Sequence, residues 1–215
     1  LIKSEHEILA LQKAIDYSVI AHRQVMQGIH QCEFEYQAAA IFHHSLQTQG
    51  CMNLAYPSIV ASGPNTCILH YTQYDRQFVS DDLLLIDAGG EYLGYAADIT
   101  RTYPVRGQWS ACQQAIYELV LSAQMEAINL LKPGLSWPAI QAKIVSVISQ
   151  GLIDLGLLFG SLDTVIETGA YRDFYMHNSG HWLGLDVHDV GTYMLDDKGI
   201  LLEKGMVMTV EPGIY

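Results

Sequence analysis

The stretch LLLIDAGGEYLGYAADITRTYPV, residues 83–105, decides the fold. It begins with the apolar run LLLID, typical of a buried strand, and continues through GG into EYLGYAADITRTY, a second strand bent at glycines. We expect the GG pair to reverse the chain direction, so that the two strands form an antiparallel hairpin. Such a hairpin would bring Asp87, at the end of the first strand, close to Asp98 in the second.

Helices and short strands are predicted before this hairpin. Ser4 and Glu7 have the spacing of a capping box, and apolar residues then recur at helical intervals to about Gly28. A second helix is predicted over residues 33–49, where a glycine ends it. The runs SIVASG and CILHY, separated by GPNT, indicate another hairpin over residues 58–71.

The second half of the chain repeats this order. Helices are predicted over residues 110–131 and 136–155, the first ending at LKPG and the second tolerating Pro138 in its first turn. Residues 174–215 again have an extended pattern. Two helices followed by antiparallel strands in each half predict an α+β fold, and we expect an internal duplication with pseudo-twofold symmetry.

Composition limits the classes of protein to which this chain can belong. The 215 residues, half of them hydrophobic and 16% charged, fit one catalytic-size globular domain over residues 1–215. A net charge of -12 disfavours nucleic acid and anionic membranes as partners. No apolar run is long enough to cross a bilayer, and the N-terminus has no signal-peptide pattern. The four cysteines show no zinc or disulfide spacing, which favours free thiols in a cytoplasmic protein.

Three carboxylates are candidates for chemistry. Asp87 ends an apolar strand, and Glu211 follows the apolar run MVMTV, where an unpartnered carboxylate would be costly. If Asp87 and Asp98 approach each other, they repel unless a proton or cation lies between them. The alternatives are that Asp87 caps a turn and that Glu211 reaches water at an edge.

Four of the nine histidines lie in candidate site positions: His70, His177, His181 and His188. His177 and His181 have the spacing of a helical metal pair, but Asn178 and Gly180 argue against a helix there. In an extended segment at most one of the two would be a ligand, and the others would serve hydrogen bonding or proton transfer. A purely structural histidine is the alternative at each position.

These candidates suit metal-dependent hydrolysis. A set of carboxylates with one histidine favours Mn²⁺, Co²⁺, Fe²⁺ or Zn²⁺ over a thiolate zinc site. Two such ions that share carboxylates can activate water and stabilise an oxyanion. No G-x-S-x-G or cysteine motif offers a protein nucleophile instead.

The ordered motifs ILHYT (68–72), LLLIDAGGEYLGYAADITRTYPV (83–105), FYMHNSGHWLGLDVHDVG (174–191) and MVMTVEPGIY (206–215) resemble those of the pita-bread metallopeptidases. That family includes methionine aminopeptidase, prolidase and aminopeptidase P. HWLGLDVHDVG with DITRTYP is most similar to the aminopeptidase P branch, which removes an N-terminal residue that precedes proline. The resemblance covers almost the whole chain and implies the pita-bread fold.

The resemblance also implies a role for each candidate residue. The site would hold a pair of ions, most simply Mn²⁺. Asp87 would bind one ion, His181 would bind the other, and Asp98 would bridge both. Glu211 would be a ligand and the general acid/base for a metal-bridging water. The remaining histidines, His70, His177 and His188, would line the pocket or contact the substrate.

One departure from the family pattern leads to a further expectation. The family has a fifth ligand, a second glutamate after the EPG motif, and aminopeptidase P has a small N-terminal domain; this chain contains neither. We therefore expect a C-terminally truncated piece of a larger protein that can form homo-oligomers, with weak metal binding and little or no activity by itself. Prolidase and a metal-free interaction module are the alternative functions.

Overall fold

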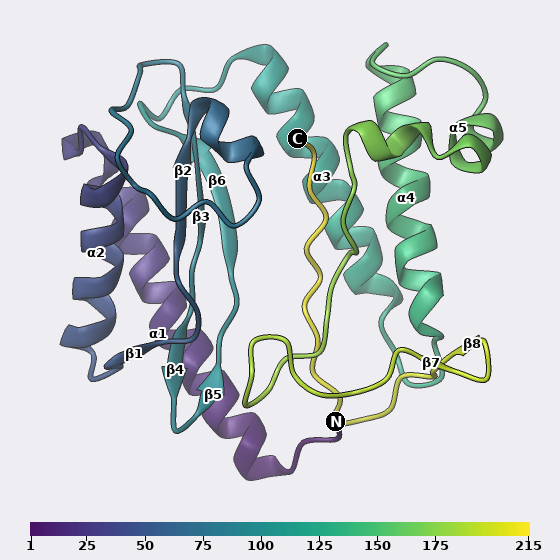
Figure 1. Cartoon of the computed structure of the whole chain (residues 1–215), viewed down its shortest axis with the longest axis horizontal. Coiled ribbons are helices and arrows are strands. Elements are labelled where there is room, and N and C mark those ends of the chain that lie inside the picture. The colour runs from purple at the N-terminus through teal and green to yellow at the C-terminus, as the bar shows by residue number, and fades with distance from the viewer. The chain divides into compact units, whose positions relative to one another are not determined.

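A computed structural model describes all 215 residues, and the chain divides into two compact units. The N-terminal unit comprises residues 3–110 with 183–189, and the C-terminal unit comprises residues 1–2, 111–182 and 190–215. Figure 1 labels the elements of both units.

The N-terminal unit begins with the predicted helix pair. Helix α1 spans Glu5–Gly28. The Ser4 hydroxyl accepts from the Glu7 N–H, and the Glu7 carboxylate accepts from the Ser4 N–H at 2.8 Å, which confirms the capping box. A 3₁₀ turn, η1 (Ile29–Gln31), leads to helix α2 (Glu35–Thr48). The two helices pack against each other, α1 also against β4 and β5, and α2 against β2.

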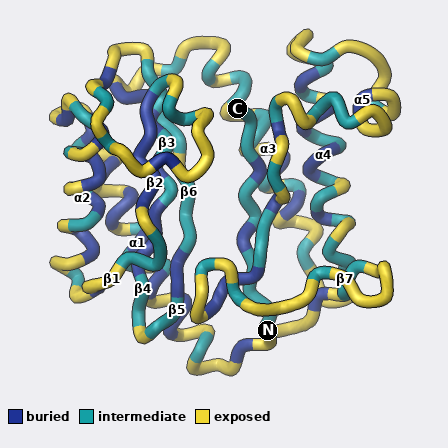
Figure 2. The backbone as a smooth tube through the Cα atoms, in the orientation of Figure 1, coloured by how far each residue is buried: buried dark blue, intermediate teal, exposed yellow.

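Two three-stranded antiparallel sheets follow. One has the order β2 (Ile59–Ser62), β3 (Leu83–Asp87), β6 (Thr100–Pro104), and the other has the order β1 (Asn53–Leu54), β4 (Gly90–Tyr92), β5 (Tyr95–Ala96). All of β2 is buried, as are alternate residues of β3, and Figure 2 shows both as mainly dark or intermediate tube. The core beneath them joins Ala21, Val25, Phe42, Leu46, Val60, Leu84 and Ile86.

The predicted pairing of the two decisive strands is right, but the predicted point of reversal is wrong. The chain turns at Leu93 and Gly94, which have φ values of 53° and 84°, and not at the GG pair. Positive φ at both central residues is what a tight two-residue hairpin turn requires. Gly89 serves close packing instead, because a Cβ there would lie 1.8 Å from the Ala97 carbonyl oxygen.

The hairpin predicted over residues 58–71 is also wrong. The GPNT segment forms the 3₁₀ helix η2 (Gly63–Cys67), with Pro64 in its first turn, and no strand follows it before β3. Proline suits a first helical turn because its missing N–H has no partner to lose there. Strand β2 pairs with β3, with Ile59 opposite Asp87.

The C-terminal unit carries the second helix pair, α3 (Ala111–Leu130) and α4 (Trp137–Asp154), close to the predicted bounds. A short helix α5 (Leu162–Thr168), capped by Ser161, and a 3₁₀ turn η3 (Ala170–Asp173) were not predicted. The core lies between α3 and α4 and the later segments, and includes Ala123, Ile144, Ile148, Leu152, Tyr175 and Trp182. The two helix pairs match the expected α+β arrangement.

The predicted strands over residues 174–215 are only partly present. The regular ones are β7 (Met194–Leu195) and β8 (Lys198–Gly199). Elsewhere extended backbone pairs locally: the Thr209 N–H donates to the His181 carbonyl at 2.9 Å, and the Glu211 N–H donates to the Ser179 carbonyl at 2.8 Å. This pairing is what positions the candidate residues of this unit.

None of the helices combines the length and the apolar character that crossing a membrane requires.

Candidate metal centre

Asp87 and Asp98 come together in the N-terminal unit. The β3–β6 register places Asp87 opposite Thr100, two residues beyond Asp98. The Tyr56 hydroxyl donates hydrogen bonds to both carboxylates, at 3.0 Å to Asp98 Oδ1. The close approach that the hairpin predicted is therefore confirmed, although the chain reverses at a different point.

Tyr56 is the residue that sequence reasoning missed. Burial first, and then the adjacent charges of Asp87 and Asp98, raise its pKa well above the ordinary value, so the phenol stays protonated and donates. The Ala55 N–H donates to the Gly89 carbonyl at 2.9 Å, which holds Tyr56 beside the end of β3. A single tyrosine between two short strands has no spacing pattern that could have indicated this contact.

His181 and Glu211 come together in the C-terminal unit. His181 Nε2 lies 3.1 Å from Glu211 Oε1, and the Thr209 hydroxyl donates to the same oxygen at 2.7 Å. Partial burial would raise the pKa of Glu211, but the hydrogen bonds from His181 and Thr209 outweigh it and hold the pKa below its ordinary value. Glu211 is thus a carboxylate whose oxygen is already oriented beside an imidazole.

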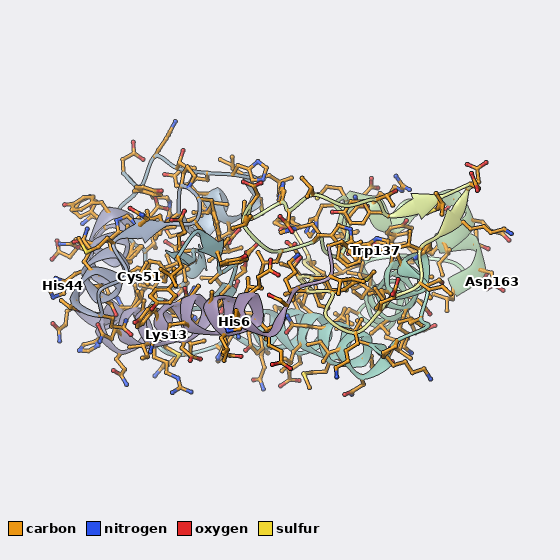
Figure 3. All side chains as sticks on the ribbon, turned by 90° about the horizontal axis from the view of Figure 1, so that it is seen from below. His6, Lys13, His44, Cys51, Trp137 and Asp163 are labelled. Carbon is orange, nitrogen blue, oxygen red and sulfur yellow. The ribbon has the colours of Figure 1, made fainter.

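Aromatic packing fixes the backbone at His181. Trp182 is fully buried, and its ring stacks on Tyr193 with centroids 5.6 Å apart and lies 4.5 Å from the ring of Trp137. Trp137, labelled in Figure 3, stands at the start of α4. Gly180 allows the close approach to the next segment, because a Cβ there would lie 2.2 Å from the Thr209 carbonyl oxygen.

The other three histidines lie on loops. His70 is exposed on the segment after η2, and His188 is exposed within residues 183–189 of the N-terminal unit. His177 accepts or donates at 3.1 Å to the Tyr215 hydroxyl in the C-terminal unit. Residues 177–181 are not helical, which confirms that His177 and His181 do not form a helical chelating pair.

The donor chemistry of both clusters fits divalent cations. One unit supplies two carboxylates that share a single phenol donor, and the other supplies an imidazole and a carboxylate. Two adjacent carboxylates repel each other unless a proton or a cation lies between them, so their closeness favours a bound cation. Oxygen donors with one imidazole are typical ligands of Mn²⁺, Co²⁺, Fe²⁺ and Zn²⁺.

Comparison with known proteins agrees with this chemistry. A family model described as metallopeptidase family M24 matches residues 10–215. The Xaa-Pro aminopeptidase of Haemophilus influenzae is 52% identical over 215 residues, which is 100% of this chain and 50% of that protein. The human Xaa-Pro dipeptidase is 35% identical over 232 aligned residues, covering 100% of this chain and 47% of that protein.

Solved structures show the same fold. Zinc-substituted Escherichia coli aminopeptidase P in complex with product superposes with a TM-score of 0.95 at 44% identity, covering 100% of this chain and 49% of that one. The chain therefore spans about half the length of the relatives that it matches. With a family match along nearly its whole length, this chain belongs to metallopeptidase family M24.

Proposed function

We propose that the protein containing this chain is an Xaa-Pro aminopeptidase, which hydrolyses the bond between an N-terminal residue and a following proline at a centre of two divalent metal ions. The observation that carries the proposal is the pairing of Asp87 with Asp98 through Tyr56 in a family M24 chain. The identity of 52% to the Haemophilus influenzae aminopeptidase supports the choice of substrate.

In this proposal Asp87, Asp98, His181 and Glu211 hold the two ions together. The ions, most simply Mn²⁺ and otherwise Co²⁺, Zn²⁺ or Fe²⁺, would supply an activated bridging water and polarise the scissile carbonyl. Glu211 accepts the proton of the attacking water and returns it to the proline nitrogen. Its orientation by Thr209 at 2.7 Å supports this role, because a general base needs a fixed hydrogen-bonding geometry.

The histidines on loops act on the substrate. We assign His70 and His188 to hydrogen bonds with the substrate and with the oxygens that gain charge during hydrolysis, where a placed donor stabilises the transition state. His177 lines the same pocket. Its ring packs edge-on against Tyr215 at 5.4 Å between centroids, which holds it in one orientation.

This set of groups suits a bond to proline. The Xaa-Pro bond is a tertiary amide without an N–H, and the ring fixes φ of the proline. An enzyme that recognises that N–H would fail on such a substrate. Carboxylates, cations and histidines that act on the carbonyl oxygen and on the proline nitrogen do not require it.

Prolidase activity on Xaa-Pro dipeptides is the second candidate function, favoured by the 35% identity to the human dipeptidase. A metal-free interaction module is less well supported, because all four proposed ligands are present. We place the protein in the cytoplasm, as a possible homo-oligomer, with peptides as partners and with neither nucleic acid nor membrane.

One experiment separates these functions. The full-length protein with added Mn²⁺ is given a three-residue Xaa-Pro-Yaa peptide and, separately, the Xaa-Pro dipeptide, and release of the N-terminal residue is followed by chromatography. We expect the tripeptide to have the higher kcat/KM and chelation to abolish turnover. Preference for the dipeptide would favour prolidase, and no turnover of either peptide with bound metal would contradict the proposal.

A further inference from the structure

Glu35 is a fully buried carboxylate outside the proposed metal centre. It lies in the first turn of α2 with 0% exposure. Burial of a carboxylate is costly unless its oxygens are hydrogen-bonded, and an apolar side chain would fill the same space without that cost. The contacts of Glu35 therefore indicate what the carboxylate contributes.

Each oxygen of Glu35 binds a different part of the segment that begins at Ser62, the last residue of β2. Oε1 accepts from the Ser62 N–H at 2.7 Å, the Ser62 hydroxyl at 2.8 Å and the Asn65 amide at 3.1 Å. Oε2 accepts from the Tyr71 hydroxyl at 2.7 Å and the Arg76 N–H at 3.3 Å. One carboxylate thus holds residues 62–65 with one oxygen and residues 71–76 with the other.

His70 lies between these two attachments. Its φ of 57° is in the left-handed region, which a residue with a side chain adopts only when its surroundings hold it there. The next residue, Tyr71, is buried against Ile59 and Ala61 of β2, and its hydroxyl reaches Glu35. The exposed turn that carries His70 is therefore anchored on both sides to one buried group.

The rest of the network fixes the far end of the segment. The Arg76 guanidinium donates to the Ser62 hydroxyl at 2.9 Å and forms an ion pair with Asp82. The Glu35 N–H donates to the Arg76 carbonyl at 3.1 Å. The segment consequently has little freedom to shift along α2 while Glu35 keeps its contacts.

We propose that Glu35 is a positioning residue for His70: it fixes the 62–76 segment so that the His70 imidazole is presented to the peptide substrate. The inference rests on the proposed function, because it takes His70 to act on substrate. Glu35 itself touches neither substrate nor metal in this proposal. A small displacement of a group that acts on the reacting atoms can lower the rate on the order of 100-fold.

The test is a double-mutant cycle in the full-length protein. Glu35→Gln keeps the size of the side chain but replaces one acceptor oxygen by an NH₂ group, so one of the two attachments loses its partner. We expect kcat/KM for Xaa-Pro-Yaa to fall roughly tenfold or more, but by less than about twofold when His70→Ala is already present. Glu33→Gln, at an exposed glutamate two residues earlier, is the matched control and should leave kcat/KM unchanged.

A second variant provides an independent test in case Glu35→Gln misfolds. Tyr71→Phe keeps the buried ring and removes one donor to Glu35, so it should give a smaller loss that also disappears in the His70→Ala background. The His70 ring resonance in a proton NMR spectrum, identified by its absence in His70→Ala, should move in both variants and not in Glu33→Gln.

The outcomes are distinguishable. Equal losses with and without His70 would show that Glu35 acts through general stability, and would overturn the inference while leaving the proposed function intact. Failure of the unmodified full-length protein to hydrolyse the peptide would remove the proposed function and this inference with it.

Discussion

His181 Nε2 lies 3.1 Å from Glu211 Oε1, and Thr209 connects the two residues. The Thr209 hydroxyl accepts from the His181 N–H at 2.9 Å and donates to Glu211 at 2.7 Å. One small side chain therefore holds the backbone of His181 and orients the carboxylate of Glu211, two residues that we propose as metal ligands.

Replacing Thr209 should weaken the centre without removing a ligand. Thr209→Val keeps the shape but loses both hydrogen bonds, and loss of a group that orients metal ligands typically lowers affinity or activity by about 10–100-fold. Thr209→Ser keeps the hydroxyl and should stay within a few-fold of the unmodified protein. Mn²⁺ affinity by calorimetry and kcat/KM on Xaa-Pro-Yaa check this, and equal behaviour of the Val and Ser variants would contradict it.

Tyr56→Phe should show what the shared hydrogen-bond donor contributes to stability, apart from what the bulk of the tyrosine ring contributes. It removes the hydroxyl that binds Asp87 and Asp98 and keeps the ring. Hydrogen bonds to charged groups contribute about 1.5–3 kcal/mol, so the metal-free protein should lose stability in that range. We expect Mn²⁺ affinity to fall as well, since the two carboxylates would lose the donor that orients an oxygen of each.

Tyr103→Phe is the matched control for this variant. The Tyr103 hydroxyl is buried and has no hydrogen-bond partner, so its removal should leave stability unchanged or slightly higher. Denaturant unfolding of the two variants in chelator makes the comparison. A Tyr56→Phe protein as stable as Tyr103→Phe would show that the phenol does not hold the two aspartates.

His22 should make the fold sensitive to acid. Burial lowers its pKa from the ordinary 6.5 to about 4, and its Nε2–H donates to the Ala88 carbonyl at 3.0 Å. Between these two values the unfolded chain binds more protons than the folded one. The contribution of neutral His22 to the free energy of unfolding is therefore complete above about pH 6.5 and is lost as the pH falls toward 4. Near pH 5 the loss is roughly 2 kcal/mol.

Urea unfolding near pH 7.5 and near pH 5 measures this loss. His22→Gln stays neutral and can still donate to Ala88, so it should lose about 2 kcal/mol less than the unmodified protein over that interval. His44→Gln, at an exposed histidine of α2 labelled in Figure 3, should keep the original pH dependence. Parallel pH dependence in His22→Gln and the unmodified protein would refute the assignment.

We propose that the 215-residue chain on its own binds Mn²⁺ weakly and shows little hydrolysis, because it spans about half the length of the relatives that it matches. Calorimetry on this chain, beside the full-length protein as control, measures both affinity and stoichiometry. Tight binding of two Mn²⁺ ions by the isolated chain would contradict this expectation.

Local signals predicted much of the fold. The capping box at Ser4 and Glu7 and the proline in the first turn of α4 act over a few residues, so helix bounds could be predicted closely. The reversal at Leu93 could not, because a leucine with positive φ is held there by the strands on either side of it. Likewise, the extended segments near Gly180 and Thr209 resemble strands in sequence but pair through only a few hydrogen bonds.

The candidate site was predicted unevenly for a related reason. Asp87 and Glu211 each end an apolar run, so their chemistry is visible in the sequence. Tyr56 and Glu35 depend on contacts between distant segments, and neither stands in a recognisable motif. Groups that bind ligands directly are therefore easier to predict here than the groups that position them.

The central proposal is that Asp87, Asp98, His181 and Glu211 hold one pair of divalent ions. Electron paramagnetic resonance of the full-length protein loaded with Mn²⁺ tests it most directly, with Asp98→Asn as the comparison. We predict two Mn²⁺ per chain with an exchange-coupled spectrum, and loss of the coupling in Asp98→Asn. Two magnetically isolated ions, or coupling that survives in Asp98→Asn, would contradict the account.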